Sequence, residues 1–257
     1  MRMRIFLLMM LAVSLLAACA SDPALNPANP MADVKRRTDI RLELATAYFS
    51  GGKYAIALDE LDRALQLSPE RADVLGLRGL TLMQLGEPER ALESLQKAMR
   101  QEPDNPDLQN NMGWFLCETG QAAKAMPLFE KALAQRNYAS PAKALLNAGS
   151  CSLKLGDKTR AEQFFLRAVE LEPDMVMAQA RLAQLTYERG DYTRARRHSQ
   201  LVIASSKAVP EHFLMAILIE RKLGDGLAEQ SLVSQWRRRF PDSTQLQAYL
   251  HGESNER

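Results

Sequence analysis

The 257-residue sequence predicts an all-α fold, a right-handed α-solenoid of six helix-turn-helix repeats followed by a C-terminal capping helix. The first observation is a set of glycines spaced by 34, 34, 36, 34 and 34 residues. The second is an alanine five residues after almost every one of them, and the third is a composition rich in Ala and Leu with only 6% aromatic residues. The periodic glycines are at positions 52, 86, 120, 156, 190 and 224.

Each periodic glycine fits a turn between two helices, and small residues at fixed distances from it fit a close helix crossing. Prolines at 69, 103, 173 and 241 stop the second helix of four units. Helix-turn-helix units with a 34-residue period resemble the tetratricopeptide repeat. Seven residues before the glycines stand Ala45, Gly79, Gly113, Gly149, Ala183 and Ile217; five after stand Ala57, Ala91, Ala125, Ala161, Ala195 and Glu229; twelve after stand Ala64, Ala98, Ala132, Ala168, Val202 and Trp236.

The six predicted repeats cover residues 38–243. A single unit cannot bury its apolar faces alone, so neighbouring repeats are expected to stack. The third carries two extra residues in a longer loop near residues 137–141, and the sixth departs from the alanine rule. Residues 244–257 are expected to form a cap and tail, with Asp242 or Ser243 as the N-cap and Leu246, Tyr249 and Leu250 facing the end of the stack. The predicted repeats are 38–71, 72–105, 106–141, 142–175, 176–209 and 210–243.

The N-terminus has the features of an export signal. A basic start and a short apolar stretch predict a secretory signal peptide over residues 1–18. Leu16-Ala17-Ala18-Cys19 resembles the lipobox of bacterial lipoproteins, which implies cleavage before Cys19 and covalent attachment of diacylglyceryl and N-acyl chains there. The alternative is an ordinary signal peptide that happens to end in Ala-Ala-Cys. Ala20, in place of Asp, implies the periplasmic face of the outer membrane by resemblance to Gram-negative lipoproteins.

Residues 19–37 are expected to form a lipidated, flexible tether, since Pro23, Pro27 and Pro30 disfavour a helix. The basic run from Lys35 to Arg37 either touches anionic headgroups or is a solvated linker end. Removing Arg2 and Arg4 leaves 31 basic against 31 acidic residues in the mature chain. That balance gives no reason to expect a nucleic-acid partner.

The sequence shows no set of residues for catalysis. The three histidines, His198, His212 and His251, belong to no HExxH motif, and no CxxC pair, nucleotide-binding glycine loop or G-x-S-x-G motif occurs. We therefore expect no catalytic residue, no metal site, no small-molecule substrate and no cofactor besides the lipid on Cys19. The protein is predicted not to be an enzyme.

Cys117 and Cys151 lie in the first helices of consecutive predicted repeats, which run side by side. An oxidising periplasm permits a disulfide between them, and closing a span of this length adds about 3 to 4 kcal/mol on the chain-entropy model. The alternative is two buried free thiols that pack as small hydrophobic residues.

The tetratricopeptide resemblance implies that positions 2, 5, 9 and 12 of each first helix line a concave groove. An apolar groove indicates a protein-binding site for a peptide or an amphipathic helix. The alternative is that tight winding already packs these side chains against each other. The predicted groove residues are Leu42, Thr46, Phe49, Leu80, Met83, Asn110 and Trp114, and the more mixed set from the later repeats is Lys143, Leu146, Leu153, Gln184, Tyr187, Leu218 and Arg221.

The lipobox, the stretch from Asn110 to Gly120 (NNMGWFLCETG) and the long loop before Ser140-Pro141 together resemble the PilF/PilW family of type IV pilus lipoproteins. This resemblance implies a pilotin-like role, in which an outer-membrane lipoprotein helps the pilus secretin to localise and form its multimer, or stabilises the pilus. Two alternatives remain. One is a scaffold for outer-membrane protein assembly or the cell-wall machinery, and the other is an accessory subunit of a periplasmic hydrolase.

Overall fold

The computed structural model describes residues 30–252, and all regular secondary structure in that range is helical. Six consecutive helix pairs and one final helix confirm the predicted solenoid. The signal peptide expected over residues 1–18, Cys19 and the tether up to residue 29 lie outside the described residues. The helices are α2 (Pro30–Ser50), α3 (Tyr54–Leu67), α4 (Ala72–Gln84), α5 (Pro88–Gln101), α6 (Pro106–Glu118), α7 (Ala122–Leu133), α8 (Pro141–Lys154), α9 (Lys158–Leu171), α10 (Val176–Glu188), α11 (Tyr192–Ala204), α12 (Pro210–Leu223), α13 (Gly226–Arg239) and α14 (Thr244–Leu250).

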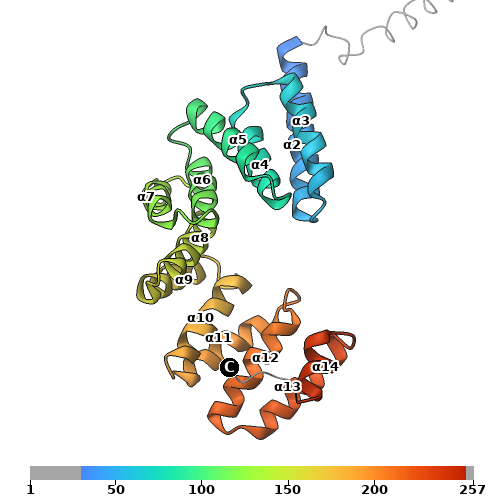
Figure 1. The fold of residues 1–257 in the computed structure, drawn as a ribbon, viewed down its shortest axis with the longest axis vertical. Coiled ribbons are helices and arrows are strands. Elements are labelled where there is room, and N and C mark those ends of the chain that lie inside the picture. The colour runs from blue at the N-terminus through green and yellow to red at the C-terminus, as the bar shows by residue number, and fades with distance from the viewer. Residues whose placement is uncertain (1–29, 253–257) are drawn as a thin grey trace, which may run out of the picture.

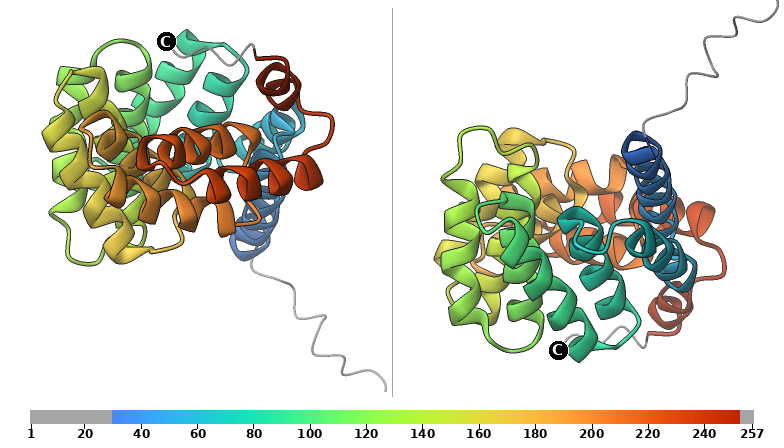
Figure 2. Two further views of the ribbon diagram at one scale, coloured as in Figure 1. Left: turned by 90° about the horizontal axis from the view of Figure 1, so that it is seen from below. Right: turned by 90° about the horizontal axis from the view of Figure 1, so that it is seen from above.

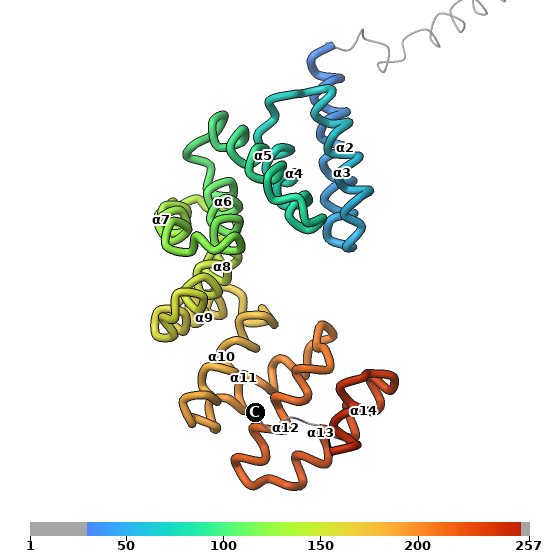
Figure 3. The backbone as a smooth tube through the Cα atoms, in the orientation of Figure 1, coloured from blue at the N-terminus to red at the C-terminus, as the bar shows by residue number. Residues whose placement is uncertain are grey.

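The helix pairs follow one another along a single curved path, with α2 and α3 at one end and α12 to α14 at the other (Figures 1 and 3). Viewed along the long axis, the first and last pairs overlap in projection (Figure 2). Figure 1 separates these two ends along that axis, so the stack is a superhelix rather than a closed ring.

Glycine ends the first helix of every pair, as predicted. All six periodic glycines have a positive φ, for example 80° at Gly120 and 79° at Gly156. A left-handed residue after the last helical turn is a conformation that glycine adopts without the steric cost of a Cβ. Proline begins several helices, including α6 at Pro106 and α8 at Pro141, where its missing N–H costs no hydrogen bond.

Close helix crossings in the second, third and fourth pairs depend on glycine. A Cβ on Gly79 would lie 2.5 Å from Leu95, and a Cβ on Gly149 would lie 2.5 Å from a ring carbon of Phe165. The large side chain of the second helix therefore fills the space that the first helix leaves open. The alanines five and twelve residues after the turn, such as Ala161 and Ala168, are fully buried beside this crossing.

Helix α2 begins at Pro30, so the structure corrects the expected tether boundary at residue 37. Proline at the first helical position is compatible with a helix. Asp33 pairs with Arg36, and Lys35 pairs with Asp39, so the basic run lies on a helix surface among its own carboxylates. Within residues 30–252, none of the helices combines the length and apolar character needed to cross a bilayer.

The sixth pair is held by large side chains rather than small ones. Ile217 and Trp236 are fully buried, and the ring of Phe213 stacks on Trp236 at a centroid distance of 6.3 Å. Helix α14 covers this end of the stack: Leu246 is buried against the cluster, and the Ser243 hydroxyl caps the helix by accepting from the Leu246 N–H at 3.1 Å. Ser243 is thus the cap in preference to Asp242, and Leu250 is exposed rather than packed.

Candidate partner-binding groove

The first helices of the pairs form the inner face of the curve. Several neighbouring first helices contact each other directly, namely α2 with α4, α4 with α6, α6 with α8, and α10 with α12, in addition to the contacts within pairs. In Figure 1, α7 and α9 lie on the outside of the curve. We define the inner face as the surface formed by α2, α4, α6, α8, α10 and α12.

The predicted groove residues of the first two repeats are largely used in packing. Leu42 lies half-buried on the cluster of Ala45, Leu61, Ala64 and Val74, and Met83 packs on the cluster around Leu82 and Leu95. Phe49 meets Tyr54 edge-on at 5.4 Å, and Leu80 is half-buried. Thr46 is exposed, and its hydroxyl donates to the Leu42 carbonyl at 2.7 Å. Leu42, Phe49, Leu80 and Met83 are therefore only partly exposed, because part of each side chain packs within the repeats.

Asn110 and Trp114 in α6 have different surroundings. Trp114 is half-buried against the core of the third and fourth repeats. Asn110 is buried, and its Oδ1 accepts from Nδ2 of Asn147 in α8 at 2.9 Å. The expectation that Asn110 lines an open surface is wrong, because its side chain joins neighbouring first helices.

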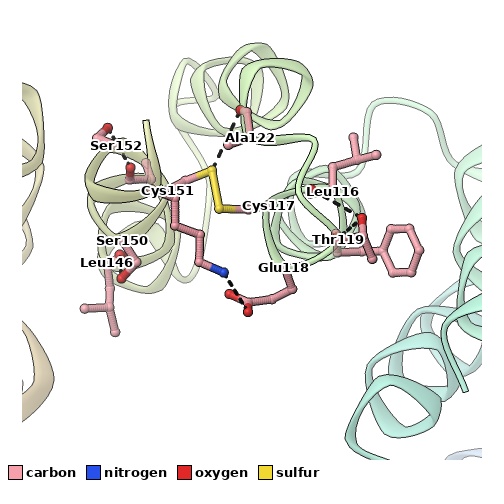
Figure 4. The surroundings of a disulfide bond; sticks show 12 residues. Leu116, Cys117, Glu118, Thr119, Ala122, Leu146, Ser150, Cys151 and Ser152 are labelled. Atoms are coloured by element: carbon pink, nitrogen blue, oxygen red, sulfur yellow. Dashed lines mark hydrogen bonds and ion pairs between the residues drawn. A yellow bond between two sulfur atoms is a disulfide. The ribbon is translucent and has the colours of Figure 1, made fainter. Parts of the chain in front are cut away.

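Cys117 and Cys151 form a disulfide between α6 and α8, with their Cα atoms 5.7 Å apart (Figure 4). Both residues are buried, and beside them Lys154 pairs with Glu118 at 2.8 Å. A covalent bond, an ion pair and the Asn110–Asn147 hydrogen bond thus connect the same two first helices. This part of the inner face has a fixed spacing between repeats.

The residues predicted from the later repeats are only partly available. Leu146 and Leu153 pack on the core, and Arg221 donates to Glu229 at 2.8 Å and to the Tyr249 hydroxyl at 3.0 Å. Tyr187 and Leu218 are half-buried, whereas Lys143 is exposed.

A pocket of about 260 Å³ opens between α10 and α12. Of the residues predicted for the groove, only Gln184 lines it. Met177 occupies position 2 of its repeat, and this position is the signal that could have identified it. The lining residues are Met177, Ala180, Arg181, Ala183, Gln184, Ser199, Val202, Glu211, His212 and Met215.

Polar groups in this pocket have distinct states. Burial lowers the pKa of His212, and its Nδ1 accepts from the Val209 N–H at 3.1 Å, so the ring is neutral at pH 7. Arg181 donates to Oε1 of Gln184 at 3.3 Å, and no carboxylate of residues 30–252 lies within 4.0 Å of its guanidinium. Glu211, on the opposite wall, accepts from Nε2 of Gln245 at 2.6 Å.

The described part of the chain, residues 30–252, holds no group of three or more His, Cys, Asp or Glu side chains that is arranged to bind a metal ion. The inner face instead offers half-buried apolar side chains, hydrogen-bonding groups and the pocket between α10 and α12. Such a surface suits the binding of another polypeptide.

The comparisons with known proteins identify the class. Tetratricopeptide repeat family models match residues 42–106, 82–147 and 142–175. The chain therefore belongs to the tetratricopeptide repeat proteins. A comparison with curated proteins gave no match.

Among solved structures, the chain is similar to PilW, described as a widely conserved type IV pilus biogenesis factor, with 29% identity and a TM-score of 0.71 over 83% of this chain and 98% of that one. It shares the fold of Pseudomonas aeruginosa PilF, with 23% identity and a TM-score of 0.72 over 86% and 99% of the two chains. A tetratricopeptide repeat protein from Parabacteroides merdae shares the fold at 18% identity and a TM-score of 0.59, over 90% and 87%.

Proposed function

We propose that the protein is a pilotin-like lipoprotein of type IV pilus biogenesis that binds the pilus secretin and promotes its assembly in the outer membrane. The similarity to PilW carries this proposal, because it extends over 98% of that chain. A structural similarity that extends along a whole chain says more than a shared local motif. The anchor is the lipid expected on Cys19.

The stretch from Asn110 to Gly120 supports the proposal through its resemblance to the PilF/PilW family, and its residues also have structural roles in this chain. Gly113 leaves room for the ring of Phe129, whose nearest carbon would lie 2.8 Å from an added Cβ. Asn110 bonds to α8, and Cys117 is bridged to α8. The stretch that resembles the PilF/PilW family therefore sets the spacing of the third and fourth repeats.

A mechanism follows from attachment and binding together. Lipid chains at Cys19 hold the mature protein at one membrane, since two or more chains make such attachment durable. The inner face binds a secretin subunit or a segment of one. Confinement at that membrane raises the effective concentration of the subunits, which favours closure of the multimer.

A complementation assay in a deletion strain tests the proposal, with heat-resistant secretin multimers in the outer-membrane fraction as the readout. Cys19→Ser is expected to leave the fold intact and to abolish correctly located multimers. Thr46→Lys places a charge on the inner face at an exposed position, and we expect fewer multimers. Gln163→Lys in α9, exposed on the outside of the curve, is the matched control.

Normal secretin multimers in the deletion strain would refute the proposal. In that case the two alternatives stated above, a scaffold for outer-membrane or cell-wall assembly and an accessory hydrolase subunit, become the working hypotheses. Crosslinking from the inner face would then identify the partner.

A further inference from the structure

We propose that the pocket between α10 and α12 is a separate binding site for an apolar side chain that lies next to a carboxylate on a partner polypeptide. This inference rests on the proposed function only in taking a polypeptide as the ligand. The residues that carry it are Met177, Ala180, Arg181, Gln184, His212 and Met215.

Several of the side chains that line the pocket are small. Ala180 and Ala183 of α10 and Ser199 and Val202 of α11 line it together with residues of α12. Its volume of about 260 Å³ is several times the roughly 30 Å³ that one water molecule occupies in the liquid. An apolar side chain of a ligand therefore has room to enter.

Two methionines line the pocket. Met177 of α10 is 52% exposed, a large fraction for an apolar side chain, and Met215 belongs to α12. Methionine side chains are flexible and polarisable, so they adapt to apolar ligand groups of different shape. The two methionines thus favour an aliphatic or aromatic side chain without selecting a single one.

The charge of Arg181 indicates which group of the ligand lies next to its apolar side chain. Arg196 and Arg221, in the adjacent helices, are each paired with a carboxylate, Glu220 and Glu229 respectively. Arg181 contacts only the neutral Gln184 among the hydrogen bonds and ion pairs of residues 30–252. Its guanidinium has five N–H donors in a planar arrangement that matches a carboxylate.

The other polar groups of the pocket do not supply that carboxylate. His212 is neutral, as its lowered pKa and the hydrogen bond to Nδ1 require. Glu211, on α12, keeps its negative charge while it accepts from Gln245, and among residues 30–252 it forms no ion pair with Arg181. The positive end of the pocket is therefore on α10, and we place the ligand carboxylate there and its apolar side chain between the methionines.

Two sources can provide this carboxylate, an acidic side chain inside a partner sequence or the C-terminus of the partner. Three peptides distinguish them: acetyl-Gly-Ser-Leu-Asp-Ser-Gly-amide, the same peptide with Asn in place of Asp, and acetyl-Gly-Ser-Gly-Leu with a free C-terminus. A fourth peptide, with Ser in place of Leu, tests the apolar requirement.

The experiment uses the mature chain carrying Cys19→Ser, with ¹³C-labelled methionine methyl groups observed by NMR. We expect the Leu-Asp peptide to shift the Met177 and Met215 signals saturably, with a Kd on the order of 1 mM. The Asn peptide should bind about tenfold more weakly, and the Ser peptide should leave both signals unchanged. Tighter binding of the free C-terminus than of the Leu-Asp peptide would identify a chain end as the source.

Arg181→Gln is expected to reduce binding of the Leu-Asp peptide to the level of the Asn peptide without affecting the Asn peptide itself. Arg167→Gln, an exposed arginine in α9, is the matched control and should change neither. The proposal is overturned if the two methionine signals do not respond, or if Arg181→Gln keeps the preference for the acidic peptide. Peptide binding reports on the pocket alone, whereas the secretin assay reports on the proposed function, so each can fail independently.

Discussion

The third and fourth repeats and the sixth repeat reach the same helix-pair architecture by opposite means. In the third and fourth repeats, Gly113 and Gly149 allow the first helix of each repeat to approach Phe129 and Phe165 closely. In the sixth repeat, Ile217 stands at the position of those glycines and Trp236 at the position of the alanines twelve residues after the turn. The space between the helices is there filled by side chains from both sides.

The two regions also differ in what fixes them to their neighbours. The third and fourth repeats are joined by the Cys117–Cys151 disulfide. The sixth repeat depends on an aromatic cluster, and Arg239 closes that cluster by donating to the carbonyls of Ile203 and Ser205 and lying over the ring of Phe213 at 5.4 Å. A repeat with only one neighbouring repeat uses large side chains and α14 to bury its apolar face.

The largest effect is expected where one side chain fills the sixth repeat. Trp236→Ala should lower the free energy of unfolding by about 3 to 5 kcal/mol, because it removes a fully buried indole and leaves a cavity. Urea unfolding followed by circular dichroism measures it. Arg237→Ala, at an exposed position beside it, is the control, and a loss below about 1 kcal/mol would show that the cluster does not hold this repeat.

Removing the disulfide tests the other region. Cys117→Ala with Cys151→Ala should lower the free energy of unfolding by about 3 to 4 kcal/mol, since the unfolded chain regains the entropy of a loop of this length. The wild-type urea midpoint should fall in reductant, and the midpoint of the double variant should not move. Equal midpoints with and without reductant in the wild type would contradict this prediction.

A pair of glycine substitutions compares the crossings directly. Gly149→Ala places a Cβ 2.5 Å from the Phe165 ring, and we expect a loss of about 1 to 3 kcal/mol from overpacking. Gly226→Ala, at the start of α13, meets open space and should stabilise the protein by up to about 1 kcal/mol. Thermal unfolding of both variants decides the matter, and effects of the same sign would disprove the crossing argument.

The smallest effect concerns pH and the fifth repeat, which lies between the two regions. Burial, with a smaller effect from Arg197 and Arg194, lowers the pKa of His198, whose Nδ1 lies 2.7 Å from Oε1 of Gln179. The unfolded state therefore binds more protons, so stability is complete above about pH 6.5 and is lost as the pH falls from there toward the folded pKa. His198→Gln should flatten this dependence between pH 7.5 and 5.5 in urea titrations, and an unchanged slope would rule the residue out.

The repeat pattern predicts the fold because each periodic residue meets a local steric requirement. A glycine such as Gly120 adopts a positive φ, and Pro103 follows the end of α5 as expected. Surface exposure is less predictable: its position in the repeat assigns Asn110 to the groove, but Asn110 is buried and bonded to Asn147 of α8. The pocket beside Met177 is not predictable from repeat position either, since it forms between repeats rather than within one.

The disulfide has a mechanical consequence. A superhelix of stacked helices extends when its two ends are pulled apart. With Cys117 and Cys151 bridged, the stretch between them, 34 residues apart in sequence, cannot add its contour of roughly 110 to 120 Å to that extension. The chain therefore lengthens only on either side of a central segment that stays short under force.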